Sequence, residues 1–220
     1  MDEQQRGSAA AAVFDALGAE YEKAFAGSAA HRSSLQWLLG RLAPGGRVLD
    51  VGSGTGRPTA ETLAGAGHEV LGVDVSPVMV DIATRQVPGA SFQCADIREL
   101  PLDDALFDAV CVYFSLLQMS RDEQERLLRR LVRALRPGGS LAVATVPLDV
   151  EDAEGVFMGQ RVRVTSFAAE DFTAKVTGAG LSVVSEESVL FTPAHPDAVP
   201  EPHLFLHCVR EGDVAVVAAR

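Results

Sequence analysis

The sequence predicts an α/β fold in which a mostly parallel sheet carries helices on both faces. Strand-like apolar runs alternate with helical segments through the middle of the chain, and a glycine-rich turn follows the first run. A loop with four prolines then separates the last two apolar runs. Alternation of strand and helix predicts parallel strands joined by right-handed crossovers. At 220 residues, the chain suits a single domain.

Two helices are expected before the sheet, at residues 9–26 and 33–42. In the first, Val13, Leu17 and Tyr21 recur at helical spacing. The sequence Ala43-Pro44-Gly45-Gly46 breaks the helical pattern and marks the start of the sheet region.

The central region is expected to alternate between strands and helices. The strands are predicted at 47–51, 69–74, 90–95, 107–113 and 139–147, and the helices at 58–66, 77–86 and 121–135. Arg136-Pro137-Gly138-Gly139 is a helix stop signal, with glycine where a left-handed conformation is needed.

Beyond residue 147 the pattern changes. We expect an acidic loop, a short strand-like run at 161–164, a helix at 168–178, and strands at 181–192 and 203–210. The prolines between the last two runs prevent regular pairing there, so this segment is a surface loop. Such a loop between neighbouring strands fits an antiparallel hairpin at the end of a parallel sheet.

Composition restricts the partners of the protein. The formal net charge of −11 disfavours nucleic acid, because the field would repel a phosphate backbone. No apolar run approaches the roughly 20 residues of a membrane span. The polar N-terminal segment indicates no secretory signal, so we expect a cytoplasmic location. His203 and His207 alternate on a predicted strand with no third ligand nearby, so no metal is expected.

The stretch from Val48 to Gly56 is the most informative motif. Its glycines, at 52, 54 and 56, let backbone lie against a ligand between a strand and a helix. Dinucleotide-binding turns favour G-x-G-x-x-G, whereas these glycines alternate and Asp50 precedes them inside the strand. Ligands of open α/β sheets bind across the carboxyl ends of the strands, where Asp74, Asp96 and Tyr113 also stand.

Together these motifs resemble the class I S-adenosylmethionine-dependent methyltransferases, in the branch that acts on small molecules. The resemblance runs from about Phe14 to His207. It rests on the glycine turn after Asp50, Asp74 closing the second strand, Ala95-Asp96-Ile97, Phe107-Asp108, and Arg136-Pro137-Gly138-Gly139. It implies a Rossmann-like seven-stranded sheet of order 3-2-1-4-5-7-6. Residues 1–43 would form lid helices, 44–147 the cofactor-binding core, and 148–211 a substrate-side insertion and C-terminal hairpin.

The implied cofactor is S-adenosyl-L-methionine, and each strand end offers matching chemistry. The Asp74 carboxylate can accept from both ribose hydroxyls, and Asp96 can accept from the adenine amine. The glycine turn suits the methionine end, and the resemblance implies that Tyr21 covers the cofactor. The predicted cofactor-binding residues are Tyr21, Asp50, Gly52, Ser53, Gly54, Gly56, Asp74, Val75, Asp96, Ile97 and Tyr113.

Methyl transfer from a sulfonium is an in-line displacement, so the protein mainly aligns donor and acceptor. A general base is needed only where the acceptor loses a proton, and His31 is the candidate. We expect Phe114, Gln118, Phe157 and Met158 to line a pocket for a small, partly apolar molecule. The fourth strand lacks a following Asp/Asn-Pro-Pro-Tyr, which argues against nucleobase and glutamine acceptors.

Two other classes of protein stay open on the same fold: a nucleotide-dependent oxidoreductase and a non-catalytic S-adenosylmethionine-binding protein. The glycine spacing, Asp96 and the absence of a Tyr-x-x-x-Lys pair argue against the oxidoreductase. The acceptor, the methylated atom and the choice between monomer and homodimer are not determined by the sequence.

Overall fold

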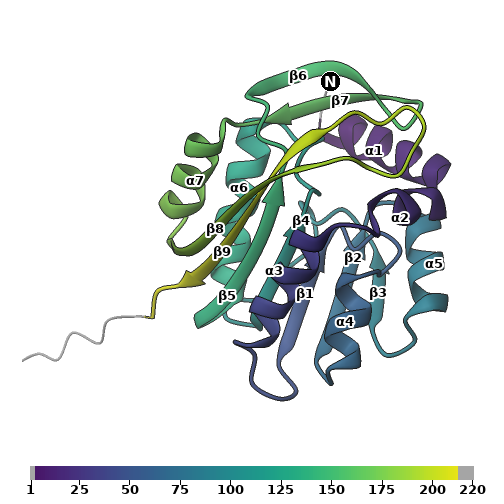
Figure 1. The fold of residues 1–220 in the computed structure, drawn as a ribbon. Helices are drawn as coiled ribbons and strands as arrows, with labels where there is room; N and C mark the ends of the chain where they lie inside the picture. Colours follow the sequence, from purple (N-terminus) through teal and green to yellow (C-terminus); the bar gives the residue numbers. More distant parts are fainter. Residues whose placement is uncertain (1–2, 213–220) are drawn as a thin grey trace, which may run out of the picture.

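The structure, a computed structural model, describes residues 3–212 and is built around one seven-stranded sheet (Figure 1). Its order is β3-β2-β1-β4-β5-β9-β8, and the first five of these strands are parallel. β9 is antiparallel to both β5 and β8. The strands are β1 (Arg47–Val51), β2 (Glu69–Asp74), β3 (Ser91–Cys94), β4 (Phe107–Tyr113), β5 (Leu135–Thr145), β8 (Leu181–Phe191) and β9 (Glu201–Arg210).

This architecture confirms the predicted α/β class. Counted within the large sheet alone, the strands follow the predicted order 3-2-1-4-5-7-6. The labels differ because two further strands, β6 (Val150–Phe157) and β7 (Gln160–Ser166), form a separate antiparallel hairpin.

Helices cover both faces of the large sheet. They are α1 (Glu3–Leu17), α2 (Ala19–Phe25), α3 (Ala29–Leu39), α4 (Thr59–Gly65), α5 (Pro77–Gln86), α6 (Arg121–Ala134) and α7 (Ala169–Gly178). Successive residues of a strand point to opposite faces. Cys111 of β4 therefore packs with residues of α3 and α4, whereas Val110 packs with residues of α6 and α7.

The N-terminal helices differ from the sequence prediction. The single helix expected at 9–26 is two helices, because Gly18 adopts a positive φ of 47° that an α-helix cannot continue. The helix expected from residue 33 begins earlier, at Ala29. The Ser28 side chain accepts a hydrogen bond from the His31 amide at 3.2 Å and caps the helix there.

The acidic loop expected after residue 147 is wrong, since this segment contains strand β6. The acidic side chains of β6 make this segment look like a loop in the sequence. They can stand in a strand because Arg163 of β7 pairs with them, at 2.6 Å from Asp152 and 2.8 Å from Glu154. The other side of the hairpin is apolar, and Val162 packs with Val13 of α1. The hairpin and α1 thus lie together above the carboxyl ends of the parallel strands (Figure 1).

The glycine turn follows β1 and is hydrogen-bonded to the end of β2. The amides of Gly52 and Ser53 both donate to the Val73 carbonyl, at 2.8 and 3.1 Å. Gly52 has a φ of 69°, and a Cβ placed on it would lie 2.3 Å from the Ser115 Cβ. Gly54 has a φ of 51°, but a Cβ there would meet no atom within 4 Å. Of Gly52 and Gly54, only Gly52 is thus fixed by both backbone conformation and crowding.

These two glycines predict unequal losses of stability. Gly52→Ala should lower the free energy of unfolding by about 2–5 kcal/mol, because strain and overpacking add. Gly54→Ala should cost only about 1–2 kcal/mol, from the left-handed backbone alone. Urea denaturation of both variants checks this, and equal losses would show that Ser115 does not limit the turn.

Candidate functional site

A cavity of about 400 Å³ lies at the carboxyl ends of the parallel strands. It is enclosed by the sheet, the N-terminal helices and the β6–β7 hairpin, and its size is typical of small-molecule sites. Eleven of the residues predicted from the sequence line it: Tyr21, Gly52, Gly54, Asp74, Val75, Asp96, Ile97, Tyr113, Phe114, Gln118 and Phe157.

Asp74, at the end of β2, organises the floor of the cavity. One carboxylate oxygen accepts from the Gly54 amide and the other from the Ser76 amide, both at 2.9 Å. Burial raises the pKa of this carboxyl, although the backbone hydrogen bonds oppose the change. Since each carboxylate oxygen can accept a second hydrogen bond, Asp74 keeps acceptor capacity toward the cavity.

Three predicted residues of the turn region do not line the cavity. Asp50 is buried behind it, and Ser53 is buried beside the turn. A Cβ on Gly56 would lie 3.0 Å from atoms of Phe92 and Val87, so this glycine permits close packing rather than ligand approach. The Asp50 Oδ2 and Ser53 Oγ atoms have no hydrogen-bond partner among the residues that the structure describes. Burial, followed by the charge of Asp74, raises the pKa of Asp50 to about 7.

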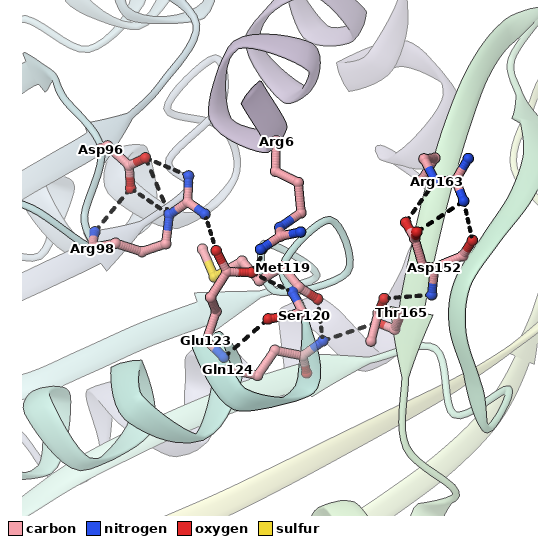
Figure 2. A network of polar contacts seen from close by, with 10 residues as sticks. All are labelled: Arg6, Asp96, Arg98, Met119, Ser120, Glu123, Gln124, Asp152, Arg163 and Thr165. Atoms are coloured by element: carbon pink, nitrogen blue, oxygen red, sulfur yellow. Dashed lines mark hydrogen bonds and ion pairs between the residues drawn. The ribbon is translucent and has the colours of Figure 1, made fainter. Parts of the chain in front are cut away.

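Asp96 follows β3 and is paired with an arginine that sequence reasoning missed. Arg98 Nε lies 2.9 Å from Asp96 Oδ1, and Arg98 Nη2 lies 2.6 Å from Oδ2 (Figure 2). Burial raises the pKa of Asp96, but the Arg98 hydrogen bonds outweigh it, so the pKa is lowered. Asp96 is therefore an ionised, oriented carboxylate at the cavity wall. The spacing Asp-x-Arg was the available signal in the sequence.

Aromatic side chains form one wall. Tyr21 of α2 meets Phe14 edge to face, with ring centroids 5.6 Å apart, and lies 4.9 Å from Phe25. Its centroid is 6.3 Å from that of Phe157, which reaches in from the hairpin. Burial, then the charges of Glu201 and Asp74, raise the pKa of Tyr21, so its hydroxyl stays protonated.

The structure does not bring the candidate base His31 to this cavity. His31 lines a second cavity of about 210 Å³, separated from the first by Tyr21, Phe25 and Phe114, which line both. Its Nε2 lies 3.1 Å from Thr59 Oγ1. Burial, followed by the neighbouring His203 and Arg32, lowers the pKa of His31 to about 4, so the ring is neutral at pH 7.

Tyr113 lines the cavity, but its hydroxyl is engaged elsewhere. The Tyr113 hydroxyl and Ser34 Oγ are 2.8 Å apart, and Ser34 Oγ is also 2.8 Å from His207 Nε2. Burial raises the pKa of Tyr113. This buried chain of polar groups joins β4, α3 and β9, and it fixes the ring of Tyr113 at the cavity edge.

The cavity lining differs at two residues from the substrate-binding set that the sequence predicts. Met158 does not line it, because it sits at the hairpin turn with a φ of 49° and packs near Val13. Glu201, the first residue of β9, does line it and was missed. Its Oε1 lies 2.9 Å from His203 Nε2. The prolines around Glu201 concealed the start of the strand.

The fold and the site together define a class of protein. Carboxylates end β2 and follow β3, a bare backbone turn follows β1, and an aromatic wall closes the cavity. These features are those of a nucleoside-cofactor site at the switch point of an open α/β sheet. Among the described residues, no cluster of three or more metal-binding side chains occurs. No helix within residues 3–212 has the length and apolar character to cross a bilayer.

The chain belongs to the S-adenosylmethionine-dependent methyltransferases of class I, and their cofactor is S-adenosylmethionine. A family model described as "Methyltransferase domain" matches residues 48–139. Methyltransferase GfsG from Streptomyces halstedii is 30% identical over 188 residues, covering 79% of this chain and 67% of that protein.

Two further proteins are similar to this chain. Demethylmenaquinone methyltransferase from Renibacterium salmoninarum is 40% identical over 101 residues, covering 46% of this chain and 41% of that protein. Matches to several curated relatives thus span less than half of their length. The solved 1,6-didemethyltoxoflavin-N1-methyltransferase from Burkholderia thailandensis, with 1,6-didemethyltoxoflavin and S-adenosylhomocysteine bound, has the same fold. Its TM-score is 0.73 at 22% identity, covering 96% of this chain and 91% of that one.

The raised pKa of Asp50 predicts a pH-dependent stability. The pKa of Asp50 is 3.8 ordinarily and about 7 in the folded protein. Between these two pH values, the folded protein retains a proton on Asp50 that the unfolded chain releases. The contribution of Asp50 to stability therefore falls as pH rises through this interval. Asparagine does not ionise, so Asp50→Asn lacks this pH dependence. The free energy of unfolding of Asp50→Asn, taken relative to wild type, should therefore be roughly 2–4 kcal/mol higher at pH 8 than at pH 4.

Thermal or urea unfolding of the cofactor-free protein at both pH values measures this difference. If the wild-type and Asp50→Asn stabilities change in parallel with pH, the pKa of Asp50 is not raised by folding.

Proposed function

We propose that this protein transfers a methyl group from S-adenosylmethionine to a small molecule held in the 400 Å³ cavity. One observation carries the proposal: the glycine turn, the carboxylates of Asp74 and Asp96, and an apolar acceptor region all line this cavity. Family membership supports it. The names of the relatives, which include a demethylmenaquinone methyltransferase, point to small organic acceptors.

The residues present fit the cofactor. Asp74 would accept from the ribose hydroxyls with its remaining acceptor capacity, and the Asp96 carboxylate would accept from the adenine amine. Val75 and Ile97 would contact the adenine, while the glycine turn would meet the methionine end. Asp50 and Ser53 would support the turn from behind, where the buried Asp50 Oδ2 and Ser53 Oγ atoms have no hydrogen-bond partner within residues 3–212. When bound, the cofactor supplies an electrophilic methyl group on a sulfonium.

The protein's own contribution is alignment and exclusion of water. Tyr21, Phe114 and Phe157 surround the space in which donor and acceptor would meet. Holding two reactants in line can lower a barrier by about 7–11 kcal/mol. The three rings come from α2, the segment after β4 and the hairpin, so the reaction space requires all three elements to be in place.

The acceptor region favours a molecule with an apolar body and one polar group. Its lining is mostly aliphatic, with Leu117, Val146, Leu148, Val156 and Val162 beside the aromatic residues. Gln118 and Glu201 are polar exceptions. The net charge of −11 argues against a nucleic-acid acceptor.

Glu201 is the carboxylate best placed to serve the acceptor. Asp74 and Asp96 belong to the cofactor side, and Glu154 is ion-paired to Arg163 with a side chain 82% exposed. Glu201 is held by His203, which is 1% exposed. Glu201 would take the proton from an acceptor O–H or N–H as the new bond to the methyl carbon forms. The electron pair of the broken C–S bond would stay on sulfur.

Several finer statements stay predictions. They are the single domain with lid (1–43), core (44–147) and substrate-side (148–211) regions, the cytoplasmic location, and a monomeric or homodimeric state. The comparisons give no support to a nucleotide-dependent oxidoreductase or to a non-catalytic cofactor-binding protein.

Cofactor binding provides the first test. Calorimetric titration should detect S-adenosylhomocysteine binding to the wild type, and Asp74→Asn should weaken it about 10- to 100-fold by removing a charged acceptor. Asp81→Asn is the matched control, because Asp81 is an exposed acid paired with Arg85 on α5. Binding of NADH in place of S-adenosylhomocysteine would overturn the proposal.

Acceptor chemistry provides the second test. Radiolabelled methyl transfer to a panel of hydroxylated and amine-bearing small molecules should identify an acceptor. With that acceptor, Glu201→Gln should reduce turnover about 10²- to 10⁴-fold and leave S-adenosylhomocysteine affinity unchanged. Glu186→Gln, on the exposed part of β8, is the control. Wild-type turnover by Glu201→Gln would exclude Glu201 as the base.

A further inference from the structure

A buried group of charges connects α1, the segment after β3 and the start of α6 (Figure 2). Its centre is Glu123, whose side chain is 1% exposed. Glu123 Oε1 lies 2.7 Å from Arg98 Nη1, and Glu123 Oε2 lies 2.8 Å from Arg6 Nε. One carboxylate therefore pairs with two arginines that come from elements far apart in the sequence, and Arg98 is also paired with Asp96.

Glu123 is fixed in this position by its own helix. The Ser120 amide donates to Glu123 Oε2 at 2.6 Å, and the Ser120 side chain accepts from the Glu123 amide at 3.3 Å. This reciprocal capping box begins α6. Burial raises the pKa of Glu123, but the hydrogen bonds from Arg6 and Ser120 and the charge of Arg98 together lower it to about 2. The carboxylate is ionised at every pH relevant to the protein.

Arg98 links this carboxylate to the cavity. Its Nε and Nη2 atoms hold Asp96, while its Nη1 atom reaches Glu123. Because a guanidinium is rigid and planar, fixing one edge of it at Glu123 also sets the direction of the edge that faces Asp96. The orientation of a cavity-lining carboxylate thus depends on a residue outside the cavity.

Helix α1 rests directly on the same pair. A Cβ placed on Gly7 would lie 2.8 Å from Arg98 Nη2 and 3.0 Å from Asp96 Oδ2. Gly7 and Arg6 both line the cavity. Close packing at Gly7 and the ion pair of Arg6 therefore hold α1 over the Asp96 side of the cavity in two independent ways.

We infer that Glu123 is a positioning residue that couples the closure of α1 over the cavity to the orientation of the Asp96–Arg98 pair. The inference rests on the proposed function, in which Asp96 meets the cofactor. Without the Glu123 charge, Arg6 would lose this ion pair and Arg98 would keep only Asp96, and a buried ion pair that loses one partner strongly destabilises proteins. Arg6 would then release α1, and Arg98 would no longer orient Asp96.

The test compares Glu123→Gln with Glu125→Gln. Glutamine keeps the shape of Glu123 and an acceptor for the Ser120 amide, but it removes the charge. Glu125 is the matched control because it lies on the same helix and is also ion-paired, to Lys175 at 2.7 Å and Arg129 at 3.5 Å. Hydrogen exchange of α1 amides in the ligand-free protein and calorimetric titration with S-adenosylhomocysteine are the two readouts.

We expect Glu123→Gln to weaken S-adenosylhomocysteine binding by about 5- to 150-fold and to speed exchange in α1, with Glu125→Gln unchanged in both. Unchanged exchange and affinity in Glu123→Gln would overturn the inference. Failure of the wild type to bind S-adenosylhomocysteine would instead refute the proposed function. The exchange experiment would then still test the contact between Glu123 and α1.

A double-mutant cycle separates coupling from a general loss of structure. Arg6→Gln should weaken S-adenosylhomocysteine binding in the wild-type background and have little further effect in Glu123→Gln. Gly7→Ala, which crowds the Asp96–Arg98 pair and leaves Glu123 intact, should also speed exchange in α1. Additive effects of Arg6→Gln and Glu123→Gln would contradict the coupling.

Discussion

The site depends on one short set of hydrogen bonds at the end of β2. The Asp74 carboxylate accepts from the Gly54 and Ser76 amides, so it joins the glycine turn to the start of α5. The Gly52 and Ser53 amides add two bonds to the Val73 carbonyl. These contacts place a bare backbone and an acceptor carboxylate side by side at the switch point of the sheet. The proposed function uses this combination to bind the ribose and methionine ends of the cofactor.

The rest of the cavity is built from segments distant in sequence. Helices α1 and α2 supply part of its lining, and the β6–β7 hairpin supplies another part. The charges around Glu123 tie α1 to the core, while Arg163 holds the acidic strand of the hairpin to its partner. The cavity thus depends on contacts between segments that are far apart in the sequence.

The sequence predicts those features that depend on local patterns. The strands of the parallel sheet, the glycine turn and the strand-end acids Asp74 and Asp96 all follow from short motifs. Contacts between distant segments were not predictable: Arg98 pairs with Glu123, and His31 lies in a second cavity behind Tyr21. The acidic residues of β6 predict a loop, since their pairing with Arg163 across the hairpin is not visible in the sequence. Glu201 stands between two prolines, which do not predict a strand. Only tertiary packing reveals these positions.

The most direct measurement of the central claim is a crystal structure with S-adenosylhomocysteine bound. The account predicts both ribose hydroxyls within hydrogen-bonding distance of the Asp74 carboxylate, which would keep its bonds to the Gly54 and Ser76 amides. It also predicts the adenine against Ile97, near Asp96. A nucleoside bound away from Asp74, or a glycine turn that rearranges and gives up its bond to this carboxylate, would contradict it.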